Sequence, residues 1–221
     1  MLTVKLILER LDKEGRLLER REQRSRSFAK GFLELLYIAH AQISYTARYT
    51  MTDIDGNGRE VDNFNESYSK LWLSTLKIGS PPGGGDAILA GRAVNETFIL
   101  PGQKIGIQVG TGATAVTPTD TALETRIAHG RSAGELEYGG CELIGIAFAD
   151  PNGEFTIRRY FTNASGGSIT VNEVGIYSIA TANFTATTGA WPFLIARDLT
   201  GGVAVADTEI LRATYVPQIM V

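Results

Sequence analysis

The chain has little cysteine, little histidine and no long apolar run. Cys141 is its only cysteine, so no internal disulfide can form and the fold does not depend on an oxidising compartment. His40 and His129 are its only histidines, which makes a zinc-type cluster improbable. No stretch reaches the roughly 20 apolar residues that span a bilayer, and charges begin at Lys5 and Glu9 where a signal peptide would need an apolar segment. We therefore expect a protein that is made and folded in a cytoplasm.

Excess positive charge is also missing. The formal net charge is −3, whereas binding to nucleic acid needs a clustered positive surface. Residues 1–26 carry eight Lys or Arg and five Asp or Glu, but the acidic residues are interleaved with the arginines, as on a solvated or ion-paired face. We expect no nucleic-acid partner, no membrane partner, no cofactor and no metal.

The first element that the sequence predicts is a β-hairpin arm. Residues 4–22 form two strand-like runs around Asp12-Lys13-Glu14-Gly15, with Gly15 where a hairpin turn favours left-handed backbone. Val4, Leu6 and Leu8 share one face of the first run, so something must cover that face. Such an arm can lie on its own subunit or reach onto a neighbour.

One helix is predicted over residues 28–42. Its apolar stripe includes Phe28, Phe32 and Leu36, and neighbouring apolar residues widen the stripe. This breadth suggests burial against a sheet and a second contact. Gly31 costs about 1 kcal/mol of helix propensity relative to alanine, so we expect close packing there.

The rest of the chain is predicted to be mainly β. Short segments rich in Ile, Val, Thr, Phe and Tyr alternate with Asn, Ser and Gly clusters, above all in residues 155–219. The Gly/Pro-rich residues 79–86 are typical of a long loop. We expect a hairpin arm and helix over residues 1–44 and, over residues 45–221, an antiparallel β-sandwich of jelly-roll or immunoglobulin-like type.

Two motifs imitate binding sites. Residues 53–58, Asp-Ile-Asp-Gly-Asn-Gly, resemble the start of a calcium loop, but Phe64 stands where a bidentate Glu is needed, so a tight hairpin turn is favoured. Residues 110–115 match G-x-G-x-x-A, yet turn residues follow where a dinucleotide site needs a helix. A glycine bend at the end of a strand is the simpler interpretation.

Catalytic and sugar-binding patterns are weak. Glu135 and Glu137 share a strand face and could serve a glycoside hydrolase, but alternating carboxylates on a solvated strand are common. An exposed aromatic residue beside Asp or Asn could bind carbohydrate, and the candidates are Trp72, Trp191, Asn183 and Asp198. We expect that the protein is not an enzyme and has no catalytic residue.

Two longer segments resemble structural proteins of tailed bacteriophages. They are residues 109–123, beginning Val109-Gly110-Thr111-Gly112, and residues 161–177, beginning Phe161-Thr162-Asn163. Ala196-Arg197-Asp198 before a Val-rich stretch completes a pattern that covers roughly residues 105–219, about half the chain. The resemblance implies a β-sandwich in a virion component of head or tail.

We therefore expect a repeated, non-enzymatic virion subunit, assembled in the host cytoplasm, that clamps neighbours on the capsid as a decoration or vertex protein. The alternatives are a tail, neck or fibre-associated protein and a carbohydrate-binding attachment module. Its partners would be copies of itself and major capsid or tail proteins. The predicted interface lies on the arm and the helix, at Val4, Leu6, Leu8, Arg20, Arg21, Arg24, Phe28, Phe32 and Leu36.

Overall fold

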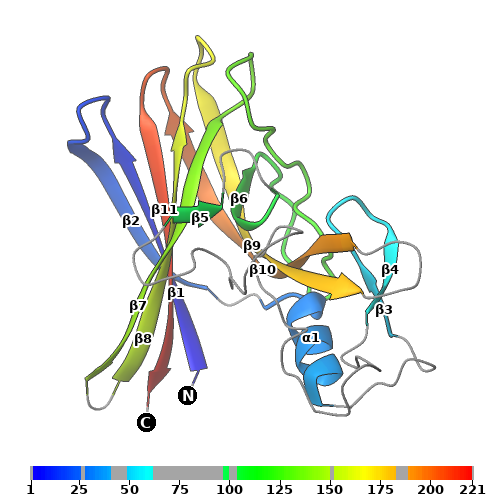
Figure 1. Cartoon of the computed structure of the whole chain (residues 1–221). Helices are drawn as coiled ribbons and strands as arrows, with labels where there is room; N and C mark the ends of the chain where they lie inside the picture. The colour runs from blue at the N-terminus through cyan, green and yellow to red at the C-terminus, as the bar shows by residue number, and fades with distance from the viewer. Residues whose placement is uncertain are drawn as a thin grey trace.

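The structure of the protein is a computed structural model, and it describes residues 2–25, 28–40, 49–61, 97–99, 104–149, 152–182 and 189–220. The larger of its sheets has six strands in the order β2-β1-β11-β8-β7-β5 (Figure 1). Their bounds are Leu2–Leu11 (β1), Leu17–Ser25 (β2), Thr97–Ile99 (β5), Glu137–Ala149 (β7), Asn152–Thr162 (β8) and Ile210–Met220 (β11). Every neighbouring pair is antiparallel.

A smaller antiparallel sheet in the order β10-β9-β6 packs on the larger one, with β6 over Gly106–Gly110, β9 over Ile169–Ala182 and β10 over Gly189–Val205. Buried side chains from both sheets form one core, since Leu6 and Tyr215 of the larger sheet join Ile107 and Val171 of the smaller one. The predicted mainly β, sandwich-like fold with one helix is confirmed for the described residues.

The hairpin belongs to this sandwich. Strand β1 lies between β2 and β11 and pairs with β11 from Leu2 opposite Ile219 to Leu11 opposite Ile210. Gly15 has the predicted left-handed backbone in the turn, at φ 82°. The structure therefore corrects the predicted division at residue 44, because the first two strands complete the sheet and are not a separate arm. The predicted loop at residues 79–86 lies outside the described residues.

Helix α1, Lys30–His40, packs at one end of the smaller sheet beside the β3–β4 hairpin, Tyr49–Thr52 and Gly58–Val61 (Figure 1). Leu35 and Ile38 of the helix form a second apolar cluster with Met51, Val61 and Phe193. The close packing expected at Gly31 is confirmed, since a Cβ there would clash with the carbonyl oxygen of Leu194. The helix begins two residues later than predicted because Phe28 and Ala29 still bond to β10.

Side chains from the larger sheet close one edge of the smaller one. Arg159, fully buried, donates to the carbonyl oxygens of Ile105 (2.8 Å) and Ile107 (3.1 Å) beside β6. The Tyr138 hydroxyl donates to the Ile127 carbonyl at 2.6 Å. Burial raises the pKa of Tyr138 to about 12, so this phenol stays protonated and continues to donate. The β6 carbonyls thus find partners inside the sandwich.

Asn163 joins the turns that connect β8 to β9 and β10 to β11. Its buried amide nitrogen donates to the carbonyl oxygens of Gly167 (2.7 Å) and Val205 (2.8 Å), and its oxygen accepts from the Ser165 amide (3.1 Å). Since the oxygen also accepts from the Ser165 hydroxyl at 2.7 Å, every hydrogen-bonding position of the side-chain amide is used.

Replacing Asn163 with Ala should lower the free energy of unfolding by about 2–4 kcal/mol, because the carbonyl of the buried Val205 loses its donor and the two turns lose the side chain that links them. Asn172→Ala is the matched control, since the Asn172 side chain makes one hydrogen bond, to the Thr111 carbonyl near the surface (2.7 Å). The control should lose only about 0.5–1 kcal/mol. Urea denaturation measures both, and equal losses would contradict a special role for Asn163.

Candidate functional site

The apolar residues predicted to clamp a neighbour are occupied within their own chain. Val4, Leu6 and Leu8 are buried, and all three belong to the sandwich core. Their face of β1 points toward the smaller sheet, since Leu6 lies opposite the equally buried Tyr215. The prediction that they contact another subunit is therefore corrected, because the core covers the face that the sequence pattern left uncovered.

The three predicted arginines of β2 differ from one another. Arg20 pairs with Glu22 at 3.0 Å on the exposed face. Arg21 pairs with Glu19 at 2.6 Å and lies on the face toward the smaller sheet. Arg24 is exposed and has no hydrogen bond or ion pair among the described residues. The prediction of an ion-paired face is thus confirmed for Arg20 and Arg21.

Side chains of the β1–β2 hairpin also cover the other edge strand of the smaller sheet, β10. Three side chains of the hairpin donate to carbonyl oxygens of β10: Arg10 to Ala204 (2.9 Å), Arg21 to Gly202 (3.0 Å) and Gln23 to Leu199 (2.7 Å). This contact corrects the role predicted for Arg21, because its guanidinium holds the two sheets of one subunit together.

The helix residues of the predicted interface are accessible. The rings of Phe28 and Phe32 stack with centroids 4.3 Å apart, and Phe28 and Leu36 are exposed. Leu33 and Tyr37 are more exposed still. We define the α1 outer face as Leu33, Leu36 and Tyr37, which lie opposite the buried Leu35 and Ile38. Leu36 is the predicted interface residue on this face, and Leu33 and Tyr37, which were not predicted, extend it.

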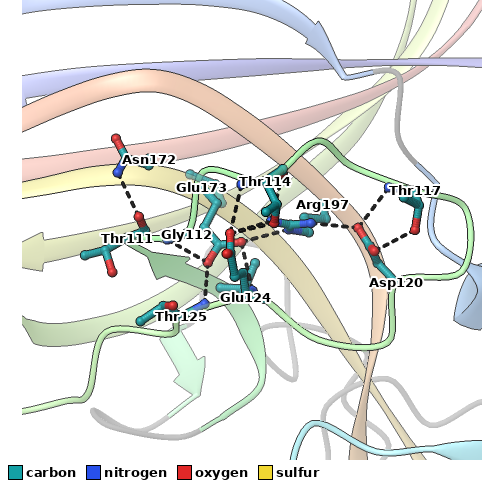
Figure 2. Close-up of polar contacts among 12 residues, drawn as sticks. Thr111, Gly112, Thr114, Thr117, Asp120, Glu124, Thr125, Asn172, Glu173 and Arg197 are labelled. Carbon is teal, nitrogen blue, oxygen red and sulfur yellow. Dashed lines mark hydrogen bonds and ion pairs between the residues drawn. The ribbon is translucent and has the colours of Figure 1, made fainter.

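The densest set of polar contacts lies under the loop of residues 111–126 (Figure 2). The Glu173 carboxylate of β9 is fully buried and accepts hydrogen bonds from the backbone amides of Gly112 (3.2 Å), Glu124 (3.1 Å) and Thr125 (2.9 Å). Arg197 of β10 donates to it from Nε at 2.7 Å. A buried carboxylate with this many donors is fully satisfied.

Arg197 extends the contacts to the far side of the loop. Its Nη1 donates to Asp120 at 2.8 Å and its Nη2 to the Thr114 carbonyl at 3.2 Å (Figure 2). Burial raises the pKa of Asp120, but hydrogen bonds from Arg197 and Thr117 outweigh it, so that this pKa lies below its usual value. These contacts hold residues 111–126 against the smaller sheet. The charged side chains of Glu173, Arg197 and Asp120 are paired with one another.

The glycine-rich motif of residues 110–115 is part of this arrangement. Strand β6 ends at Gly110 and a loop follows, so the predicted glycine bend is confirmed. A Cβ on Gly112 would clash with Glu124 and Glu173. The Gly112 amide, which a phosphate would need in a dinucleotide site, donates to the protein's own carboxylate.

The calcium-like motif is a hairpin turn between β3 and β4, as predicted. Asp53 is buried, and its Oδ1 accepts from the amides of Asp55 (2.9 Å) and Asn57 (2.8 Å). Its Oδ2 accepts from Arg59 Nε at 2.6 Å. The buried carboxylate therefore stabilises the turn through these hydrogen bonds.

The carboxylates considered for hydrolysis have local partners. Glu137 accepts two hydrogen bonds from Arg131, at 3.0 and 2.8 Å, and Glu135 accepts one from the Ser132 amide at 2.9 Å. The bonds from Arg131 lower the pKa of Glu137, whereas a general acid needs a raised one. His129 accepts from the Tyr138 amide at 2.9 Å.

The residues considered for carbohydrate binding do not form an exposed site in the part that the structure describes. Trp191 is partly buried beside the helix cluster, with the Arg59 guanidinium 4.8 Å from its ring. Asp198 is buried and accepts from the Tyr215 hydroxyl at 3.0 Å. Trp72 and Asn183 lie outside the described residues.

Sequence reasoning missed Glu173 and the role of Arg197. The available signal was a charge inside an apolar strand, since Glu173 stands between Val171 and Val174, and Arg197 follows Ala196. Such a charge is buried only when it is paired. The sequence does not identify the partner, because Asp120 is far away along the chain.

Among the described residues, no group of three or more His, Cys, Asp or Glu side chains is placed to hold a metal ion. None of the helices within those residues has the length and apolarity to cross a membrane. Comparisons of the chain with profiles of protein families, with curated proteins and with solved structures find no match.

Proposed function

We propose that the protein is a non-enzymatic structural component of a tailed phage virion, a repeated subunit that clamps neighbouring proteins on the capsid as a decoration or vertex protein. The resemblance of residues 109–123 and 161–177 supports the virion class. The sandwich supports a structural role, because Glu173, Arg197 and Asp53 all serve contacts within the fold.

The α1 outer face carries the proposal. A helix of eleven residues with apolar side chains on opposite sides is typical of a helix covered on both sides. Leu35 and Ile38 cover one side within the subunit, and Leu33 and Tyr37 remain exposed. Exposed apolar patches on a rigid body mark surfaces that bind other proteins.

The sandwich provides the rigid support for this contact. Helix α1 is fastened to β10 through the Ala29 amide, which donates to the Ile195 carbonyl at 3.0 Å, and through the close approach of Gly31 to Leu194. A neighbour bound to the helix is therefore held at a fixed position relative to both sheets. In a repeated assembly such contacts multiply, so each can be modest.

Two other roles are tested by different measurements. A tail, neck or fibre-associated protein would occupy a few axial positions in a particle map, whereas a decoration protein would repeat over the capsid lattice. An attachment module would bind immobilised glycans, whereas the proposed clamp would not. We favour the capsid because a sandwich with one exposed apolar helix suits lateral contacts on a surface.

Changing Leu33 and Tyr37 together to Asp should reduce incorporation of the protein into particles at least tenfold. Each change removes an apolar contact of about 1.5–3 kcal/mol and places a charge in the interface. The measurement is the amount of tagged variant that co-sediments with purified particles from a producing culture.

The matched control is Leu17→Asp, since Leu17 is an exposed leucine on β2, away from α1. Both variants should melt as the wild type does, because exposed substitutions change stability by about 0.5 kcal/mol or less. Incorporation of the helix variant at the wild-type level would contradict the proposal.

A further inference from the structure

We infer that the outer end of the β7–β8 hairpin binds the same hairpin of a second copy of the chain. We define this surface, the distal hairpin, as residues 143–149 of β7 and 152–157 of β8. In Figure 1 the two strands continue to the lower left, away from β9 and β10 of the smaller sheet. Ile146 is 66% exposed and Phe148 is 77% exposed.

The exposed residues continue the face that forms the sandwich core. Phe148 lies opposite Gly153 and Leu143 opposite the buried Ile157, and the pairing of β8 with β11 places the exposed Ile219 beside Gly153. A Cβ on Gly153 would meet the Phe148 ring at 2.8 Å, so the ring rests on the bare backbone of the opposite strand. A positioned aromatic ring on a core-like face is typical of a contact anchor.

The β2 edge of the larger sheet and the distal part of β7 differ in charge. Strand β2 carries five charged residues at 19–22 and 24, a pattern that protects an edge against pairing. Residues 143–149, Leu-Ile-Gly-Ile-Ala-Phe-Ala, carry none. Among the described residues, β5 pairs with β7 only at Cys141 and Glu142, and no described strand pairs with residues 143–149 on that side.

This difference in charge indicates which partner binds the distal hairpin. A head-to-tail contact would place the uncharged β7 edge against the charged β2 edge of the next copy and would remove charged side chains from water without supplying new partners. A contact related by a two-fold axis places residues 143–149 against themselves, and an axis perpendicular to the strands makes the two copies of β7 antiparallel. The copy-to-copy contact then buries no charge within these residues.

The size of the surface predicts a weak dimer. The exposed parts of Ile146 and Phe148 amount to roughly 250 Å² per copy, below the roughly 800 Å² per partner of stable interfaces. We expect a dissociation constant of roughly 10–100 μM for the isolated protein. The inference rests on the proposed assembly role, because only a repeated array makes such a contact persistent.

Sedimentation velocity of the purified full chain, from about 1 to 300 μM, tests the inference. The average mass of the wild type should rise from that of one chain toward two, and Ile146→Asp should weaken association at least tenfold. Leu17→Asp is the matched control because Leu17 is an exposed leucine (54%) of β2, at the opposite edge of the same sheet, and it should associate as the wild type does. A monomeric wild type at every concentration, or equal weakening by both variants, would overturn the inference.

Cross-linking tests the two-fold arrangement separately. Cys141 is buried, so Ile146→Cys, at the centre of the segment, should form the disulfide between copies under mild oxidation, and Leu17→Cys on β2 should not. Cross-linking of Leu17→Cys alone would refute the contact. A protein that is monomeric in solution but incorporated into particles would contradict this inference alone, whereas a dimer absent from all particles would contradict the proposed function alone.

Discussion

Deletion of residues 2–25 should abolish cooperative unfolding of the protein. The deletion removes Val4, Leu6 and Leu8 from the core and strips β11 of its partner along ten pairs of residues. Losing three buried aliphatic side chains costs about 2–5 kcal/mol each, which is comparable to the roughly 5–15 kcal/mol that holds a domain folded. The deletion also removes the donors that cover the β10 carbonyls.

Circular dichroism with urea as denaturant measures this effect. The truncated chain should show no sigmoidal transition, whereas Leu6→Ala should retain one with a loss of about 3 kcal/mol. Leu17→Ala is the control on an exposed leucine of the same hairpin, and it should change stability by about 0.5 kcal/mol or less. A truncated chain that melts as the wild type does would show that the hairpin is a dispensable arm.

Replacing Arg197 with Met should lower the free energy of unfolding by about 3–5 kcal/mol, because it leaves the Glu173 carboxylate buried without its cation and takes the partner from Asp120. The control is Arg131→Met, which removes the exposed ion pair with Glu137. Since exposed ion pairs contribute about 1 kcal/mol or less, the control should be nearly neutral. Equal losses would contradict a structural role for the buried contacts.

The pH dependence of this loss of stability tests whether Asp120 contributes to it. Because the folded pKa of Asp120 lies below its ordinary 3.8, the contact with Arg197 stabilises the fold above that pH and is lost as the pH falls through the folded pKa. The stability difference between wild type and Arg197→Met should stay constant from about pH 7 to pH 5 and shrink only below pH 3.8. Shrinkage already between pH 7 and 5 would show that a group other than Asp120 contributes.

The sequence predicts elements where the signal is local. Alternation in residues 4–8 and the turn at Gly15 identify the first hairpin, and helical spacing identifies α1 to within two residues at its beginning. The sequence does not predict that β11 covers β1, because the two strands are about two hundred residues apart along the chain. An apolar strand face predicts that another element packs on it, but it does not predict which element.

The same limit applies to the candidate surfaces. Phe28, Phe32 and Leu36 were predicted as an interface from helical spacing, and the fold leaves their side of the helix accessible. Val4 has an equally apolar pattern and is buried. Local patterns cannot separate the two, because burial depends on which distant strand arrives beside each face.

The central position of the last strand determines when the sheet can be completed. Strand β11 lies between β1 and β8, so the first and eighth strands cannot join until residues 210–220 have left the ribosome. Because β1 and β11 are about two hundred residues apart along the chain, closing the sheet should be slow. Until then the apolar face of β1 that carries Leu6 is exposed on the nascent chain. Chaperones that recognise apolar segments can bind it during that time.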